Sequence, residues 1–470
     1  MSFRSSENQN PNPNPNPNAS PTPPSKKQLW LNSKPLAEML MAMKLKSNPI
    51  LSLDRTLLLS DELLLKILAS ISDSQTQRNA NSLVCKRWLN LQGRLLRSLA
   101  ISDWNFILSG RLIHRFPNLN HVDLISATFH SHPNSAILLS HRHLTLHLAS
   151  DNCSFFQDHA AVLPVDTGLA ALAAACPNLR RLRVIGTSEI GLLSVAEDCP
   201  TLQDLELHRC TDSVLRGIAA CRNLQILKLV GHVDGIYKSV VSDIGLTILA
   251  QGCNRLVKLE LSGCEGSFDG VKAIGKCCQM LEELTISDHR MDDGWLAALA
   301  FCENLKTLRF VSCKRIDYNP GLEEYLGCCP ALERLHLEKC QLRDKKSLAA
   351  LFSVCRNVRD IVLQDCWGLD NAMFSLAMIC RRVKLLYLEG CSLLTTEGLE
   401  SVIHSWRDLQ RLRVVSCKNI KDNEISPALA TLFTTLKELR WCPDTKLLLP
   451  SSLVGITIGK KGGKFFRRTR

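Results

Sequence analysis

The sequence lacks any long hydrophobic run: no stretch approaches the roughly 18 consecutive apolar residues that a membrane-spanning helix needs. The N-terminus is polar and rich in proline, without the apolar segment of a secretory signal. We therefore expect no membrane partner and a location in the nucleus, the cytoplasm or both. Thiols in these compartments stay reduced, so the 21 cysteines are not expected to form a disulfide framework.

Catalytic signatures are also missing. There is no glycine-rich phosphate loop, no His-Glu-x-x-His motif and no Ser/His/Asp pattern outside the repeat described below. The formal net charge is +12, and half of it comes from six Lys or Arg in the last dozen residues, GKKGGKFFRRTR. The remainder is mildly basic and does not by itself indicate a nucleic-acid-binding protein. We therefore expect no enzyme, no cofactor and no nucleic-acid partner, with the basic tail serving solubility or nuclear import.

What the chain does contain is a repeat, Cys-x-x-Leu-x-x-Leu-x-Leu-x-x-Cys. Two clear copies are CPTLQDLELHRC at 199–210 and CNRLVKLELSGC at 253–264. The first leucine of the repeat recurs from Leu179 to Leu436, mostly every 22–27 residues, within the range of leucine-rich repeats. A degenerate copy, PNLNHVDL, places the start of the array near residue 112. The one long gap contains an insertion, HVDGIYKSVV.

Each repeat predicts one strand and one helix. The Leu-x-Leu core alternates with period two, as in a strand with one buried face. Helix-length segments such as SDIGLTILAQGC separate the strands, with apolar residues at helical spacing and a polar residue near the N-cap. Because no single unit buries its own apolar face, stacking supplies the core. The fold class is α/β: a solenoid with a parallel concave sheet and outer helices.

The cysteines fall into two columns in register with the repeat. Nine "opening" cysteines stand three residues before the first leucine, and seven "closing" cysteines stand eight residues after it. The opening column is Cys176, Cys199, Cys221, Cys253, Cys278, Cys302, Cys329, Cys355 and Cys380, and the closing column is Cys210, Cys264, Cys313, Cys340, Cys366, Cys391 and Cys417. A zinc site needs about four ligands that converge on one point, whereas each column offers one residue per repeat. We therefore predict that these cysteines pack in the core and bind no metal.

Two amphipathic segments precede the array. The first is LLLSDELLLKILASI at 57–71, which Ser60 or Asp61 can cap. The second is NANSLVCKRWLNLQGRLLRSLAI at 79–101, in which we expect one helix to carry Leu83, Val84 and Trp88. About 40–50 residues make a poor core alone, so the apolar stripes need a partner or the adjacent solenoid.

The array resembles the cysteine-containing subtype of leucine-rich repeats from about residue 112 to residue 441. The segment in front of it resembles an F-box, the motif that docks on a Skp-type adaptor in SCF ubiquitin ligases. One difference is Ser60, where F-boxes usually have proline, but serine caps a helix equally well. The resemblance implies a small all-α F-box whose adaptor-binding residues are Leu59, Leu63, Leu64, Ile67, Leu68, Leu83, Val84, Cys85 and Trp88.

These observations predict four regions: a disordered Pro/Asn-rich tail at 1–48, the F-box at 50–100, a solenoid of about 11–12 repeats at 105–445, and a C-terminal cap with the basic tail at 446–470. The resemblance implies a non-catalytic substrate-recognition subunit of an SCF ligase, bound to an adaptor and through it to a cullin. Two alternatives are a leucine-rich interaction scaffold without a ubiquitin role and a small-molecule hormone co-receptor. The leading helices could also merely cap the solenoid.

The target-binding surface is predicted from the positions that flank the second leucine, because they point away from the core. Arginine gathers there in the last repeats, with one tyrosine nearby, a composition common at interface hot spots and suited to carboxylate or phosphate groups. The candidates for contact with an unknown target protein are Tyr387, Arg411, Arg413 and Arg440, together with Tyr237 in the insertion.

Overall fold

The computed structural model describes residues 55–71, 74–101, 104–125, 162–232, 240–320 and 326–443. The chain divides into two compact units, Met1–Ile71 and Ser72–Arg470. The boundary lies inside the segment predicted as an F-box. The predicted N-terminal tail, the insertion with Tyr237 and the basic C-terminal tail lie outside the described residues.

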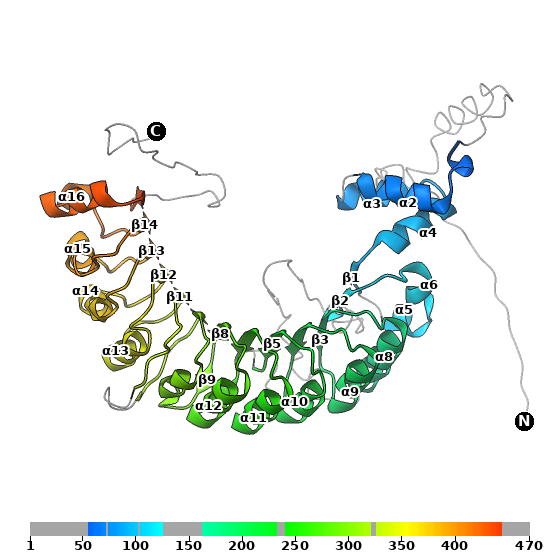
Figure 1. Ribbon diagram of the computed structural model, residues 1–470, viewed down its shortest axis with the longest axis horizontal. Helices are drawn as coiled ribbons and strands as arrows, with labels where there is room; N and C mark the ends of the chain where they lie inside the picture. Colours follow the sequence, from blue (N-terminus) through cyan, green and yellow to red (C-terminus); the bar gives the residue numbers. More distant parts are fainter. Residues whose placement is uncertain are drawn as a thin grey trace, which may run out of the picture. The chain divides into compact units, whose positions relative to one another are not determined.

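The described part of the first unit is helical. It contains the short 3-10 helix η1 (Arg55–Leu58) and the α-helix α2 (Asp61–Ser70) (Figure 1). The predicted cap is present, because the hydroxyl of Ser60 accepts a hydrogen bond from the amide of Leu63 at 3.3 Å. Asp61 and Glu62 occupy the first turn of α2, where a carboxylate interacts favourably with the helix dipole.

The second unit opens with two helices rather than one. The helix α3 (Gln75–Ser82) begins after Ser74, and α4 (Lys86–Leu95) begins after Cys85. The expectation that one helix carries Leu83, Val84 and Trp88 is wrong: the first two lie in the turn between α3 and α4. The reason is the cap at Cys85, whose sulfur accepts the amide of Trp88 at 3.4 Å and starts a new helix there.

A sheet of 13 parallel strands runs through the second unit. Its register is direct, so that the buried Leu259, Leu284 and Leu308 of successive strands are paired partners. The strands, in spatial order, are β1 (Ser98–Ala100), β2 (His121–Asp123), β3 (Arg181–Ile185), β4 (Asp204–His208), β5 (Ile226–Val230), β6 (Lys258–Ser262), β8 (Glu283–Ser287), β10 (Thr307–Val311), β11 (Arg334–Glu338), β12 (Asp360–Gln364), β13 (Leu385–Glu389), β14 (Arg411–Val415) and β15 (Glu438–Cys442). A separate pair is formed by β7 (Glu265–Gly266) and β9 (Arg290–Met291). The predicted α/β repeat architecture is confirmed.

Helices return the chain between strands on the outer side of the curved sheet (Figure 1). The α-helices are α5 (Trp104–Leu108), α6 (Arg111–Arg115), α8 (Val162–Ala175), α9 (Glu189–Asp198), α10 (Asp212–Ala219), α11 (Asp243–Gly252), α12 (Phe268–Cys277), α13 (Lys345–Val354), α14 (Asn371–Phe374), α15 (Thr396–Ile403) and α16 (Pro427–Thr435). Three further segments are 3-10 helices, namely η4 (Trp295–Phe301), η6 (Ser375–Ile379) and η7 (Asp422–Glu424). No helix among the described residues is long and apolar enough to cross a membrane.

One continuous cluster of buried apolar side chains extends from Ile101 to Phe433. Every cysteine of the opening and closing columns is buried, so the prediction that they pack in the core is confirmed. Their thiols also point at backbone carbonyls: Cys278, for example, lies 3.5 Å from the carbonyl oxygen of Cys253, in the repeat before it. Thiols of this kind join neighbouring repeats by weak S–H···O contacts, whereas others, such as Cys264, contact a carbonyl of their own strand.

A left-handed turn follows almost every long strand. The residue directly after the strand has φ between 43° and 71°, a conformation that non-glycine residues rarely adopt. This residue is Gly186, Arg209, Gly263, Asp288, Ser312, Lys339, Asp365, Gly390 or Ser416. The turn directs the next residue, usually the closing cysteine, back into the core.

Candidate functional site

The helices that resemble an F-box carry apolar side chains on their surface. In the first unit Leu63 is 49% exposed and Ile67 is 42% exposed, whereas Leu64 and Leu68 are buried. The helix α2 therefore buries one apolar side, at Leu64 and Leu68, and leaves a second apolar side exposed at Leu63 and Ile67. Leu58 in η1 is 72% exposed and was not among the predicted adaptor-binding residues.

The turn between α3 and α4 presents a second apolar surface. Leu83 is 86% exposed, Val84 is 60% exposed, and Cys85 is exposed as well. Trp88 is half-buried, and its indole Nε1 has no hydrogen-bond partner among the described residues. Large aliphatic side chains this exposed at consecutive positions are unusual for a monomer and mark interaction sites.

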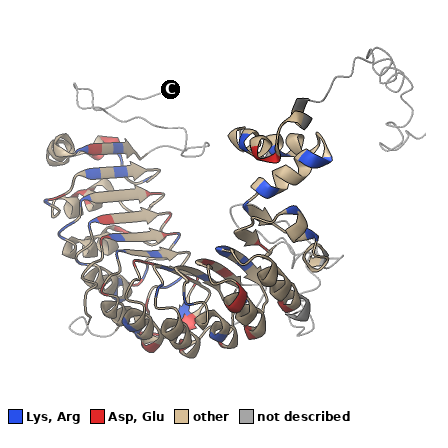
Figure 2. Cartoon of the chain, turned by 45° about the vertical axis from the view of Figure 1, so that its right-hand side comes forward, with Lys and Arg blue, Asp and Glu red and all other residues tan. Residues whose placement is uncertain are grey.

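The inner face of the sheet is formed by the first and third residues of most five-residue strands, which stay partly exposed while the second and fourth are buried. The fifth residue is also partly exposed in strands such as β6, β10 and β11. Charged residues of both signs line it (Figure 2). In the early strands they pair with one another: Arg183 Nε lies 3.0 Å from Glu206, and Lys228 Nζ lies 3.1 Å from Glu260. The positive and negative charges in this part of the surface therefore compensate one another.

Glu206 is the centre of the early charge cluster. Burial alone would raise the pKa of its carboxyl, but the hydrogen bond with His208 at 3.0 Å and the charges of Lys228 and Arg183 outweigh burial. Together they lower the pKa of Glu206 to about 2. The ionised Glu206 carboxylate is thus held by contacts within the chain, with His208, Lys228 and Arg183.

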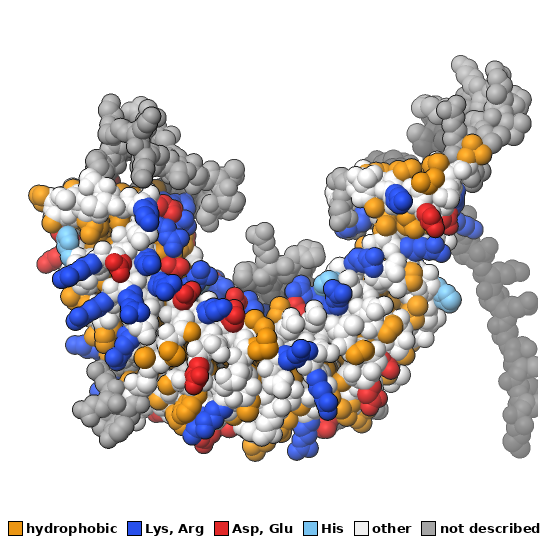
Figure 3. Space-filling view, viewed as in Figure 1, with side chains coloured by type: hydrophobic (Ala, Val, Ile, Leu, Met, Phe, Trp, Pro, Cys, Tyr) orange, Lys and Arg blue, Asp and Glu red, His pale blue; other side chains and the backbone are white. Residues whose placement is uncertain are grey.

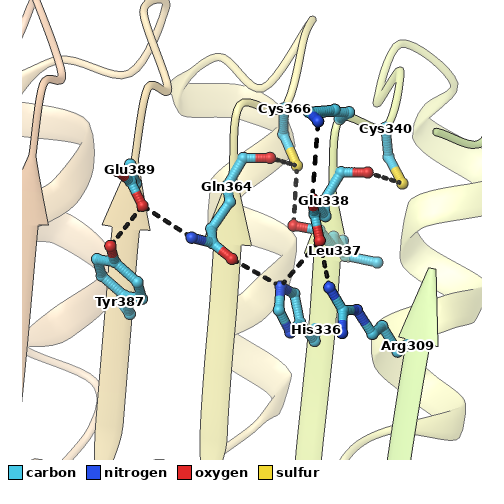
Figure 4. Close-up of polar contacts among 10 residues, drawn as sticks. Arg309, His336, Leu337, Glu338, Cys340, Gln364, Cys366, Tyr387 and Glu389 are labelled. Carbon is cyan, nitrogen blue, oxygen red and sulfur yellow. Dashed lines mark hydrogen bonds and ion pairs between the residues drawn. The ribbon is translucent and has the colours of Figure 1, made fainter. Parts of the chain in front are cut away.

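A chain of polar contacts crosses β10 to β13 (Figure 4). Arg309 pairs with Glu338, His336 Nε2 lies 2.8 Å from Oε1 of Gln364, and the Gln364 amide donates to Glu389 at 2.7 Å. Burial and the charge of Arg309 lower the pKa of His336. The contacts give these side chains fixed positions on the inner face.

Four predicted target-binding residues come together at the end of the solenoid. Tyr387, Arg413 and Arg440 occupy paired positions on β13, β14 and β15. The Tyr387 hydroxyl donates to Glu389, and Arg413 Nη2 pairs with Glu438 at 2.7 Å.

The arginines of this group differ in how they are held. Arg411 Nη2 reaches back two strands to Asp360 at 3.3 Å. Arg440 forms no ion pair among the described residues. The sequence could not distinguish the paired arginines from Arg440, because their partners lie on other repeats.

A polar cleft of about 400 Å³ lies beside this group, along the starts of the strands β8 to β14. Five basic residues and four acidic ones line it. Within it Arg359 pairs with Glu333 at 3.0 Å, whereas Lys384 forms no ion pair among the described residues. The lining is Glu282, Glu283, Lys306, Thr307, Glu333, Arg334, Arg359, Asp360, Lys384 and Arg411.

The described residues contain no group of three or more His, Cys, Asp or Glu that could hold a metal ion. Burial raises the pKa of the Cys221 and Cys302 thiols to about 12, which makes these two thiols poor nucleophiles. The charged and hydrogen-bonding side chains of the inner face can support recognition of a partner.

Comparisons with known proteins agree with this picture. The chain is 23% identical over 364 residues to GRR1-like protein 1 of Arabidopsis thaliana, a match that covers 74% of this chain and 57% of that protein. It is 22% identical over 414 residues to F-box protein MAX2 homolog A of Petunia hybrida, covering 77% and 57%. The chain is therefore similar to two plant proteins, one of which is named as an F-box protein. The chain spans just over half the length of both relatives.

No protein-family model matches the chain. Among solved structures, it is similar to the TLR13–ssRNA13 complex, with 18% identity, a TM-score of 0.43, and coverage of 71% of this chain and 41% of that one. The mouse RP105/MD-1 complex gives 19% identity, a TM-score of 0.39, and coverage of 72% and 49%. Because both TM-scores are below 0.5, the fold rests on the strand pairing described above.

Proposed function

We propose that the protein is the substrate-recognition subunit of an SCF ubiquitin ligase. The observation that carries the proposal is the exposure of large apolar side chains on the F-box-like helices, at Leu63, Ile67, Leu83 and Val84. A Skp-type adaptor would cover these side chains and connect the chain to a cullin. Leu64 and Leu68 are buried in the chain itself, so the adaptor contact is assigned to the exposed members of the predicted set.

In this role the protein is not itself a catalyst. It holds a target protein close to the ubiquitin that another subunit delivers, which converts an encounter between separate molecules into a transfer within one complex. Location in the nucleus or the cytoplasm belongs to the same proposal.

Adaptor binding is tested by co-purification of the full chain with a Skp-type adaptor. We expect a stable complex that Leu63→Ala with Ile67→Ala, or Leu83→Ala with Val84→Ala, weakens at least about tenfold, because truncation of buried apolar anchors removes most of the interface energy. Ile190→Ala with Ile244→Ala is the matched control, since these isoleucines are 71% and 67% exposed on the solenoid. Absence of a complex, or equal weakening by the control pair, contradicts the proposal.

The target is assigned to the inner face near the end of the solenoid. Arg440 carries a charge with no ion-pair partner among the described residues, and Tyr387 lies two strands away in the same row. Lys and Arg side chains gather over the last repeats (Figure 3). An acidic segment of a target protein complements this surface better than a neutral one.

The arginines make separable predictions for target binding. Arg440→Glu should weaken capture of the ubiquitination target at least about tenfold and leave the melting temperature nearly unchanged, because no ion pair to it is broken. Arg413→Glu should lower the melting temperature as well, since it places a second carboxylate beside Glu438. The measurement is quantitative affinity capture with proteasome inhibition, followed by thermal melting of each variant. If the double variant Arg440→Glu with Arg411→Glu captures the target as well as the unmodified chain does, the target does not bind at this end of the inner face.

A further inference from the structure

A second cavity, of about 350 Å³, lies away from the inner face, where the loops after β10 and β11 meet the start of α13. Its floor contains the apolar side chains of Ile316, Leu342 and Leu348, each 2% exposed or less, together with the buried Asp317 and Ser347. The Asp317 carboxylate accepts the amides of Gly294 at 2.8 Å and Leu296 at 3.0 Å, so it is already hydrogen-bonded within the chain. A volume of this size lies within the range of about 300–1,000 Å³ typical of ligand pockets. The floor suits an apolar side chain of a ligand.

Two exposed aromatic side chains stand on or beside the rim. Tyr318 lines the cavity and is 64% exposed, with the Arg315 guanidinium 5.1 Å from its ring centre. Trp367 is also 64% exposed, and its backbone is bonded to the next loop, where its carbonyl accepts from the amide of Leu342 at 2.6 Å. Exposed Trp and Tyr next to Arg are the residue types enriched at binding hot spots.

The rim is basic, and part of the basic charge is placed against the preference of the helix. Arg315 and Arg343 form no ion pair among the described residues. The first turn of α13 contains Lys345 and Lys346 and no acidic residue, although cations near a helix N-terminus are disfavoured by its dipole. The two lysines add positive charge beside the cavity, while the N-cap carboxylate of Asp344 accepts the amides at the start of the helix.

We propose that this aromatic–basic edge, formed by Arg315, Tyr318, Arg343 and Trp367 around the cavity, binds a short acidic peptide segment of a partner protein. One large apolar side chain of the segment enters the cavity and its carboxylates pair with the arginines. Such a segment is complementary to the apolar side chains in the cavity and to the positive charge of its rim. The proposal concerns a surface separate from the inner face and does not depend on the SCF assignment.

A peptide fits this edge better than a nucleic acid. A nucleic-acid strand needs a continuous basic track for its phosphates. Here the exposed carboxylate of Asp344 lies in the rim of the cavity. The carboxylate accepts the amides of Lys346 and Ser347 at the start of α13, so it is fixed in place and interrupts the continuous basic track that a nucleic-acid strand needs.

The test uses the full chain and two fluorescein-labelled peptides in fluorescence polarisation. One peptide has glutamates on both sides of a single tryptophan, and the other has serine in place of the tryptophan. We expect the tryptophan peptide to bind at least about tenfold more tightly than the serine peptide. Arg315→Glu with Arg343→Glu, and separately Trp367→Ala, should each weaken it at least about tenfold.

The matched control is Arg381→Glu with Arg382→Glu, which changes the net charge equally at two exposed arginines before β13. It should change the affinity by less than about twofold. Tyr318→Ser provides a milder variant, and far-UV circular dichroism verifies that each variant is folded. Equal binding of the two peptides, equal weakening by the control pair, or tighter binding of a single-stranded oligouridine with the same sensitivity to substitution overturns the proposal.

Discussion

At the residue scale, the cysteines show what a repeat reveals and what it leaves out. Their spacing was sufficient to predict that they pack in the core, because one thiol per repeat cannot converge on a metal. The contacts of the thiols with carbonyls of the preceding repeat, such as Cys329 with Leu299 at 2.9 Å, could not be predicted. Those contacts depend on how two repeats stack, which the pattern within one repeat does not specify.

Burial also determines how the thiols react. Because only the thiolate is nucleophilic, a pKa raised to about 12, as at Cys221 and Cys302, leaves about one thiol in ten thousand reactive at pH 8. We expect iodoacetamide at pH 8 to modify Cys85, which is exposed, and to leave these two thiols unmodified until the chain is denatured. Mass spectrometry of native and urea-treated samples measures this. Alkylation of Cys221 or Cys302 in the folded chain would contradict it.

At the element scale, successive helices are connected by one recurring contact. Asp243, the first residue of α11, accepts the amide of Ser267 at 2.7 Å and the amide of Gly270 at 3.0 Å from the start of α12. A Cβ on Gly270 would lie 2.3 Å from the Asp243 carboxylate. Equivalent close approaches occur at Gly191, Gly245 and Gly398. The glycine is therefore a steric requirement for the neighbouring repeat.

Gly270→Ala tests this contact. Alanine normally stabilises a helix interior by about 1 kcal/mol relative to glycine, but here its methyl group collides with Asp243. We expect the melting temperature to fall by several degrees in Gly270→Ala and to recover partly in Asp243→Ala with Gly270→Ala, which removes the collision. Non-additivity of this kind is the signature of two residues in contact. A rise in melting temperature for Gly270→Ala alone would show that the contact does not constrain the helix.

At the scale of the whole molecule, the regular part of the chain was predictable and the irregular parts were not. In the 13-stranded sheet, the strands from β3 to β15 coincide with the Leu-x-Leu motif or its apolar variants, because the two-residue period of the sequence is also the side-chain period of a strand. The sheet itself begins at β1 (Ser98–Ala100), before the expected start near residue 112, since a three-residue strand has no periodic signal. For the candidate surfaces, the sequence located the arginines of the inner face, but their partners lie on strands of other repeats. The aromatic–basic edge is formed by loops of different repeats.

The continuous core and nearest-neighbour strand pairing predict that damage to one repeat stays local at first. Leu308 on β10 is fully buried, and Leu308→Ala should cost about 2–5 kcal/mol through lost burial and a cavity. Because each repeat contacts its neighbours, amide hydrogen exchange should accelerate most in β8, β10 and β11 and least in β3 and β4. Thr307→Ala, at a partly exposed position of the same strand, is the matched control and should leave exchange nearly unchanged. Uniform acceleration across the whole sheet would instead mean that the solenoid unfolds as a single cooperative unit.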